Sequence, residues 1–186
     1  MSVIKGIKMK LLKLFIAAVI SGSMAAPAFA ADGKINFNGR ITMATCTVDT
    51  RTVIVNLPDV GATTLKGKGT TGGEAPIIIN LTDCGILEGD GDIANVRVKF
   101  DGDNDTTNGD LLKISSVSGG GGAKGVGIGI YEKDGSMPIK IKEFSKGTPV
   151  TMGVTTLEFK AKYVATGETV TPGTVKASTD FTLDYE

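Results

Sequence analysis

Two cysteines, Cys46 and Cys84, are the residues of this sequence best suited to covalent chemistry. Two cysteines without any histidine are too few ligands for a typical structural zinc site. A redox centre would need the Cys-x-x-Cys spacing, which is absent. An even count favours a disulfide if the chain enters an oxidising compartment. Closing a loop of this length would stabilise the fold by roughly 4 kcal/mol on chain-entropy grounds.

An acidic run from Asp101, DGDNDTTNGDLL, partly resembles a calcium-binding loop. Acids stand at its first, third and fifth positions, as such a loop requires. However, Thr106 stands where the loop needs glycine, and Leu112 stands where it needs a bidentate glutamate. We therefore expect an acidic surface loop between strands and no metal site.

A glycine-rich run from Ser118, SGGGGAKGVGIGI, partly resembles a phosphate-binding loop. Its Lys124 precedes the next glycine, no serine or threonine follows, and no helical pattern begins there. We expect no nucleotide and no other cofactor. The glycines instead favour a tight connection and a close backbone approach in a strand at 126–131.

Catalytic constellations are absent or cannot be singled out. Without histidine there is no Ser-His-Asp or Cys-His arrangement. Twenty acidic residues could include a carboxylate pair for glycoside cleavage, but they lie mostly in turns and none forms a distinct pair. We expect that the protein is not an enzyme.

The elements that must position these residues are short runs of alternating apolar and polar side chains, separated by Gly, Asp and Asn turns. No helical period is long enough to predict a helix. Asp134-Gly135 is a hairpin signal between two of the runs. The pattern predicts one all-β domain, a two-sheet sandwich of about seven strands. The expected strands inside the domain cover 52–57, 76–81, 96–100, 126–131, 137–141, 157–163 and 175–185.

One further alternating run, KINFNGRIT at 34–42, precedes Cys46. Its odd positions are apolar or glycine and its even positions are polar, as in a strand with one buried face. An ordinary first strand, paired within its own chain, is one interpretation. A strand that fills the core of another molecule is the other, and Gly39 favours it because strand interiors usually avoid glycine unless something approaches closely.

The N-terminal 30 residues have the pattern of a secretory signal peptide. Four lysines precede a short apolar run, and Ala28-Phe29-Ala30 is an A-x-A cleavage site. We expect a mature chain that begins at Ala31, with 16 basic and 20 acidic residues and a net charge of about −4. With no basic run, nothing predicts a nucleic-acid partner.

Taken together, the opening strand, the cysteine pair, INLTDC, GVGIGIYEKDG, LEFKAKYVATGETVTPG and the alternating tail resemble a type 1-like fimbrial subunit, a pilin of the chaperone-usher pathway. The resemblance covers essentially all of residues 31–186. Gly173, fourteenth from the C-terminus, and Tyr185, the penultimate residue, match the family's signature for chaperone and usher recognition. The family builds a structural fibre on the bacterial surface that supports cell adhesion.

The resemblance implies an incomplete immunoglobulin-like sandwich that lacks its last strand, with a hydrophobic groove beside the C-terminal strand. A periplasmic chaperone lends a strand first, and the N-terminal extension of another subunit then replaces it at an outer-membrane usher. The implied edge of the groove, which is also the expected recognition surface, consists of Gly173, Val175, Ala177, Thr179, Phe181, Leu183 and Tyr185.

The resemblance also divides the chain into a signal peptide at 1–30, a donor extension at 31–44 and a pilin domain at 45–186, exported through the periplasm to the fimbria. It implies that Cys46 and Cys84 form the disulfide of the pilin domain. The expected donor residues are Gly33, Ile35, Phe37, Gly39 and Ile41.

Other functions stay open at this point. A secreted monomeric β-sandwich binding module would pair the 34–42 strand within its own chain. A minor or adaptor pilin would share every feature of a major subunit. A pilus-tip adhesin would normally add a lectin domain ahead of the pilin domain, and the mature chain leaves no room for one.

Overall fold

The computed structural model describes residues 44–49, 51–86, 95–115 and 121–186. The expected signal peptide and the expected donor strand at 33–41 therefore lie outside the described residues. No helix within the described ranges is long and apolar enough to cross a membrane.

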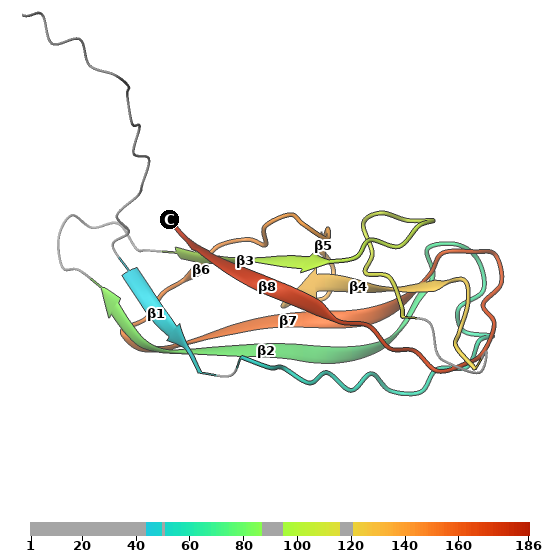
Figure 1. Ribbon diagram of the computed structural model, residues 1–186, viewed down its shortest axis with the longest axis horizontal. Coiled ribbons are helices and arrows are strands. Elements are labelled where there is room, and N and C mark those ends of the chain that lie inside the picture. Colours follow the sequence, from blue (N-terminus) through green and yellow to red (C-terminus); the bar gives the residue numbers. More distant parts are fainter. Residues whose placement is uncertain (1–43, 50, 87–94, 116–120) are drawn as a thin grey trace, which may run out of the picture. The chain divides into compact units, whose positions relative to one another are not determined.

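The described residues form eight strands in two sheets (Figure 1). The larger sheet has the order β1-β2-β7-β4-β5, the smaller has the order β6-β3-β8, and all pairs are antiparallel. This confirms the all-β sandwich predicted from the alternating runs. The strands are β1 Ala44–Val48, β2 Thr71–Ile86, β3 Asn95–Gly102, β4 Val126–Glu132, β5 Pro138–Ile139, β6 Thr148–Pro149, β7 Gly153–Ala165 and β8 Thr179–Tyr185.

The core lies between the two sheets because strand register brings apolar side chains opposite one another. In the larger sheet Ile79 of β2 pairs with Leu157 of β7, and both are buried. In the smaller sheet Phe100 of β3 pairs with Phe181 of β8. Phe100 also meets Phe159 of the larger sheet edge to face, with ring centroids 5.4 Å apart. Apolar burial of this kind is the main term that holds the sheets together.

Most strand predictions are confirmed, and β2, β3 and β7 extend beyond the predicted runs. The Asp134-Gly135 hairpin is confirmed between β4 and β5. The strand predicted at 137–141 is largely wrong, because β5 covers only Pro138–Ile139. The chain leaves the sheet after β5, since Lys142 has a positive φ of 73° and its N–H bonds the carbonyl of Phe100.

Two predicted strands join no sheet over part or all of their length. The strand predicted at 175–185 begins only at Thr179, which lies opposite Gly102 at the end of β3. The strand predicted at 52–57 is wrong, because those residues belong to no strand and pair with no sheet. Both corrections have one cause, which is that a strand exists only where a neighbouring backbone accepts its hydrogen bonds.

The acidic run forms a loop that its own side chains close. Asp105 accepts backbone hydrogen bonds from Thr107 at 2.8 Å and Asn108 at 3.0 Å. Within the described ranges, no group of three or more Cys, Asp or Glu side chains could hold a metal ion. The Asp105 carboxylate thus orders the backbone of this loop.

The glycine-rich run enters β4 as a closely approached strand. A Cβ added at Gly129 would lie 2.8 Å from the ring of Tyr131 and 2.9 Å from Val164. These neighbours of Gly129 are side chains, whereas at Gly127 a Cβ would lie 3.3 Å from the backbone oxygen of Leu112, which is a close backbone approach of the kind predicted for the strand at 126–131.

Candidate functional site: an open groove between two unpaired edges

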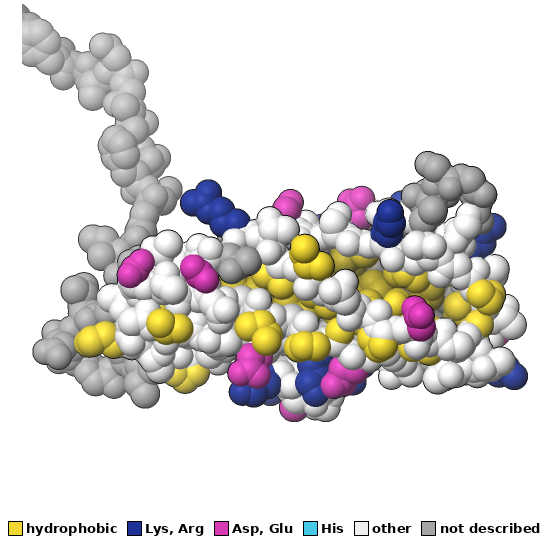
Figure 2. Space-filling view, turned by 90° about the horizontal axis from the view of Figure 1, so that it is seen from below, with side chains coloured by type: hydrophobic (Ala, Val, Ile, Leu, Met, Phe, Trp, Pro, Cys, Tyr) yellow, Lys and Arg dark blue, Asp and Glu magenta, His cyan; other side chains and the backbone are white. Residues whose placement is uncertain are grey.

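A groove of about 700 Å³ opens along one side of the sandwich, between residues 51–57 and residues 175–181. Figure 2 shows this face, where apolar side chains are visible within a hollow that has polar rims. The floor comes from β2, β3, β4, β7 and the loop before β4. Its side chains are Ile77, Ile79, Phe100, Leu112, Ile128, Ile130, Ala161 and Tyr163.

The first rim is the extended segment 51–60. Its residues make no backbone–backbone hydrogen bond with one another or with any other described residue. Val53, Val55 and Leu57 are partly buried and pack on the core, whereas Ile54 between them is 80% exposed. The segment therefore has the shape and the alternation of a strand but lacks the hydrogen bonds of one.

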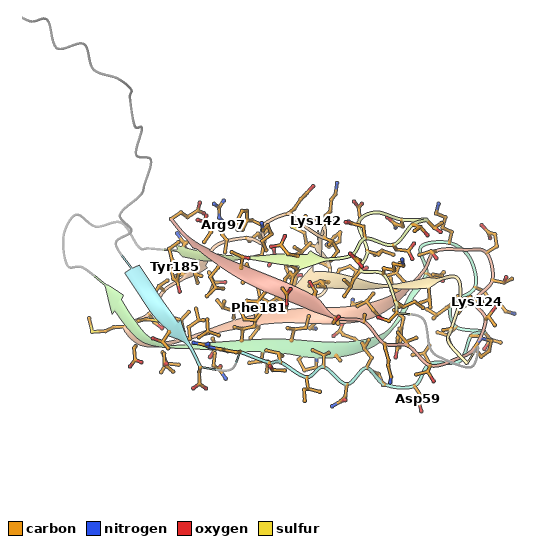
Figure 3. The ribbon with its side chains drawn as sticks, in the orientation of Figure 1. Asp59, Arg97, Lys124, Lys142, Phe181 and Tyr185 are labelled. Carbon is orange, nitrogen blue, oxygen red and sulfur yellow. A yellow bond between two sulfur atoms is a disulfide. The ribbon has the colours of Figure 1, made fainter. Side chains whose placement is uncertain are left out.

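The second rim is β8 with the residues before it. β8 bonds β3 along one edge, and no described strand bonds its other edge. Of the residues that the resemblance implies for this edge, Val175, Ala177, Thr179 and Phe181 line the groove. Phe181 lies on β8 in Figure 3 and is only partly buried.

A second recess of about 460 Å³ continues the groove toward the C-terminal end of β8. Thr179, Asp180 and Phe181 line both recesses, so the two are neighbours along β8. Thr47, Val48 and Arg51 form the opposite side of the second recess. Leu183 lies beyond the residues that line these recesses and packs on the core cluster.

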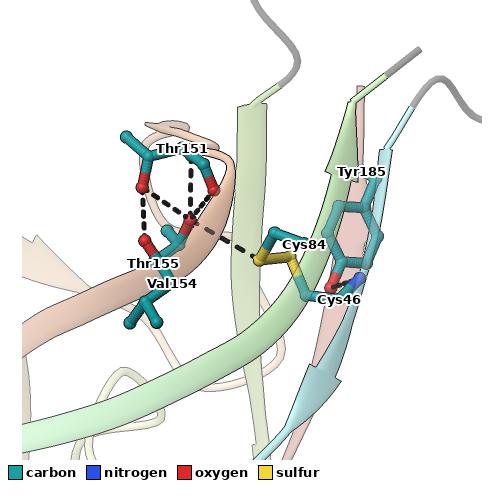
Figure 4. Close-up of a disulfide and its surroundings, with 6 residues drawn as sticks. All are labelled: Cys46, Cys84, Thr151, Val154, Thr155 and Tyr185. Carbon is teal, nitrogen blue, oxygen red and sulfur yellow. Dashed lines mark hydrogen bonds between the residues drawn. A yellow bond between two sulfur atoms is a disulfide. The ribbon is translucent and has the colours of Figure 1, made fainter.

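Tyr185 joins β8, the second rim, to β1 at this end of the groove. Its hydroxyl accepts a hydrogen bond of 3.2 Å from the backbone N–H of Cys46 in β1 (Figure 4). Burial raises the pKa of Tyr185, and the bond from the Cys46 N–H partly opposes that rise. The phenol is consequently neutral at physiological pH, and it closes the groove between β8 and β1.

The predicted disulfide between Cys46 and Cys84 is confirmed. It joins β1 to β2 with a Cα–Cα distance of 4.1 Å and encloses a sequence separation of 38 residues. The bridge lies directly beside the Tyr185 hydrogen bond (Figure 4). It therefore fixes the strand that closes the groove.

Gly173 stands at a point where two backbones touch. A Cβ at this position would lie 2.5 Å from the backbone nitrogen of Ala123. The next residue, Thr174, donates to the carbonyl of Gly121 and accepts from the N–H of Ala123. The structure thus gives Gly173 a packing role between two loops, which the sequence analysis did not predict.

Sequence reasoning identified the β8 rim but missed the rim at 51–57 and the floor. The TVIVNL run at 52–57 was predicted to be a strand, but nothing in its residue types indicates that no neighbouring strand pairs with it. The floor residues are ordinary inward positions of paired strands, and only their place opposite the gap distinguishes them.

Comparison with known proteins decides the family. Residues 35–186 match the family profile described as "Fimbrial protein". The chain belongs to this family. The subunit is 37% identical over 174 residues to "Long polar fimbria protein A" of Salmonella typhimurium, covering 91% of the subunit and 92% of the relative.

A second relative and a solved structure agree. The subunit is 33% identical over 171 residues to "Probable major fimbrial subunit LpfA" of Escherichia coli O157:H7, covering 91% and 92% of the two chains. The crystal structure of the "P pilus rod subunit PapA" matches with a TM-score of 0.61 at 20% identity, covering 76% of the subunit and 99% of that chain. The match to this crystal structure shows a shared pilin fold.

The protein is therefore a structural subunit of a bacterial surface fimbria, and not an enzyme. Subunits of such pili polymerise with other subunits. This finding replaces the alternative of a secreted monomeric binding module.

Proposed function

We propose that the subunit polymerises by accepting a strand from another molecule between residues 51–57 and 175–181. The observation that carries this proposal is the pair of facing edges without sheet partners, above an apolar floor. A strand placed there could form ladders with both edges and cover the core at the same time. Unpaired edges of this kind are otherwise prone to uncontrolled association.

The donor that we propose is the extension at 31–44 of a second copy or a related subunit. Its apolar positions Ile35, Phe37 and Ile41 would enter the groove, with Gly39 where less room remains and Gly33 at the leading end. The polar residues between them would face water. Burying three large side chains at about 1.5–3 kcal/mol each would make a substantial contribution to holding a fibre together without covalent links.

Export and assembly follow the same proposal. Residues 1–30 would act as the signal peptide, and 45–186 would form the pilin domain. A periplasmic chaperone would cover the groove before polymerisation, because an exposed apolar groove is an aggregation hazard. An outer-membrane usher would then exchange the chaperone for the donor strand. The surface residues that these two partners recognise would include Gly173 and the inward positions of the β8 rim.

The test uses the mature subunit and a synthetic peptide of residues 31–43. A variant lacking 31–43 should form no homopolymer, but it should bind the peptide and become more resistant to urea. A matched peptide with Phe37→Asn should bind much more weakly, whereas Asn38→Ser should bind like the original. Fibre growth by the deleted variant would refute the donor assignment.

A further inference from the structure

A short turn at the start of β7 displays two apolar side chains to solvent. Met152 is 70% exposed and Val154 is 58% exposed, on either side of Gly153. They belong to the few large apolar side chains of the described residues that the fold leaves in water. Two such neighbours make a small apolar projection, which we name the β7 turn.

Hydrogen bonds of Thr151 and Thr155 hold the β7 turn in place. Thr155 accepts a hydrogen bond of 2.9 Å from the N–H of Thr151 and donates one of 3.2 Å to its carbonyl. The hydroxyl of Thr151 also bonds the carbonyl of Val154, and the hydroxyl of Thr155 lies 3.6 Å from the sulfur of Cys84 (Figure 4). A rigid apolar projection loses little conformational entropy when it docks.

The β7 turn lies at the same end of the sheet as the start of β1. Gly153 pairs with Cys84 of β2, and Thr45 of β1 pairs with the adjacent Gly85. Since β1 and β7 flank β2, the turn is about two strand spacings, roughly 10 Å, from the point where the chain enters the domain.

A neighbouring subunit must come close to this point, an argument that rests on the proposed function. Only Thr42 and Met43 separate Ile41, the last donor residue, from Ala44, the first residue of β1. Three peptide links span at most roughly 11 Å. The subunit whose groove holds Ile41 therefore has a surface within reach of the β7 turn.

The groove itself indicates which end of the neighbour this is. Tyr185 of the β8 rim bonds Cys46 of β1 at one end, whereas no hydrogen bond between described residues joins 51–60 to 171–178 at the other end. The free end of a donor can stop at the closed end. Its tethered end must leave by the end without the bond, beside the loop 166–174.

The exposed charges at the two ends differ, with three lysines beside the loop 166–174, which itself carries the exposed Glu168, and an acid beside the β7 turn. Lys66, Lys68 and Lys124 are exposed at the end of the neighbour where the donor would leave, and none forms an ion pair with a described residue (Lys124 is labelled in Figure 3). Asp83 is exposed beside Cys84, next to the β7 turn, and likewise has no described ionic partner. Val170 offers a partly buried apolar side chain within the loop 166–174.

We propose that the β7 turn docks on the loop 166–174 of the neighbouring copy, with Asp83 facing the lysines of that end. This contact would add a second attachment beside the donor strand. It would stiffen the joint between successive subunits and slow their separation.

The first test compares fibres of the wild type with those of Met152→Ser/Val154→Thr and of Met137→Ser. Met137 is 44% exposed in the β4–β5 hairpin, and Glu132 of that hairpin pairs with Phe159, so the control is roughly 20 Å along β7 from the turn. We expect the double variant to bind the 31–43 peptide normally, while its fibres dissociate in guanidinium about tenfold faster. The Met137→Ser fibres should dissociate like the wild type.

The outcomes are distinguishable. Fibres of the double variant that dissociate at the wild-type rate would overturn the docking proposal and leave the donor proposal intact. Reduced peptide binding by the double variant would also overturn it, because the turn would then act on the groove. A wild type that neither binds the peptide nor forms fibres would refute the donor proposal, and the docking proposal with it.

A second test locates the contact directly. A photo-reactive benzophenone side chain at position 152 should cross-link to a neighbour's peptide that contains Val170, as identified by mass spectrometry. Cross-linking of a neighbour's peptide from the β4–β5 hairpin at 132–139, which lies roughly 20 Å from the turn within one subunit, would instead show a different contact and would overturn the proposal.

Discussion

The closed and open sides of the core are built from the same alternating pattern but reach different burial. Leu157 and Phe159 of β7 are 0% and 3% exposed, because strands flank β7 on both sides. Phe181 and Leu183 of β8 occupy equivalent inward positions, yet they are only partly buried, because β8 has a described neighbour on one side alone. Alternation therefore decides which way a side chain points, and the neighbouring strands decide how completely it is buried.

The difference also shows how an unfinished domain can still be folded. The sheet that contains β2, β7 and β4 supplies most of the fully buried side chains. The open side contributes partly buried residues whose contacts await a further strand. The closed side can hold the fold together while the open side is available for assembly.

The largest expected effect comes from removing the Cys46–Cys84 disulfide. The double variant Cys46→Ala/Cys84→Ala should lose about 4 kcal/mol of unfolding free energy in urea titrations. Without the disulfide the unfolded chain has more conformational entropy than the cross-linked one, which favours unfolding. The variant should also bind the 31–43 peptide more weakly, since β1 presents the N–H that holds Tyr185. A loss below about 1 kcal/mol would show that packing alone fixes β1.

A matched pair of truncations sharpens the comparison itself. Leu157→Ala on the closed side should destabilise the isolated subunit by about 3 kcal/mol, and Leu183→Ala on the open side by about 1 kcal/mol. Urea unfolding at low protein concentration measures both. Adding the donor peptide should narrow the gap, because a strand over the groove makes Leu183 more buried. If both substitutions lowered the unfolding free energy equally without the peptide, Leu183 would not lie on an open side of the core.

Gly173 tests whether loop packing supports the open rim. Gly173→Ala should cost about 1–3 kcal/mol, because a Cβ has no room beside the backbone of Ala123. Gly109→Ala is the matched control, since nothing lies within 4 Å of a Cβ placed there. Thermal unfolding of both variants checks the prediction, and equal melting temperatures would reject the packing role.

The smallest effect concerns the outer surface of the closed sheet. Hydrogen bonds from Lys160 at 2.6 Å and Lys162 at 3.0 Å lower the pKa of Glu74. The stabilisation is therefore present above the ordinary glutamate pKa and is lost as pH falls through the lowered value. Glu74→Gln should slightly flatten the acidic decline of the melting temperature. An unchanged acid profile would show that these exposed ion pairs add nothing measurable.

Much of the fold could be predicted because local features, namely the alternation of apolar and polar residues and the turn residues, determine most of its strands. The runs at 76–81, 96–100, 126–131 and 157–163 became strands, and Asp134-Gly135 became a hairpin. These segments have partners, so local pattern and tertiary structure agree. The run at 52–57 has an equally good pattern but no partner, and the same reasoning failed there.

The sequence by itself determined the alternation of β3 and β7, the cysteine pair, the absence of histidine-based chemistry and the family resemblance of the tail. Only the tertiary structure decided that 51–57 faces 175–181 across a groove, that Tyr185 closes one end on Cys46, and that Gly173 separates two loops. The physical reason is that alternation is a property of one strand, whereas a missing hydrogen-bond partner is a property of two segments far apart in the chain.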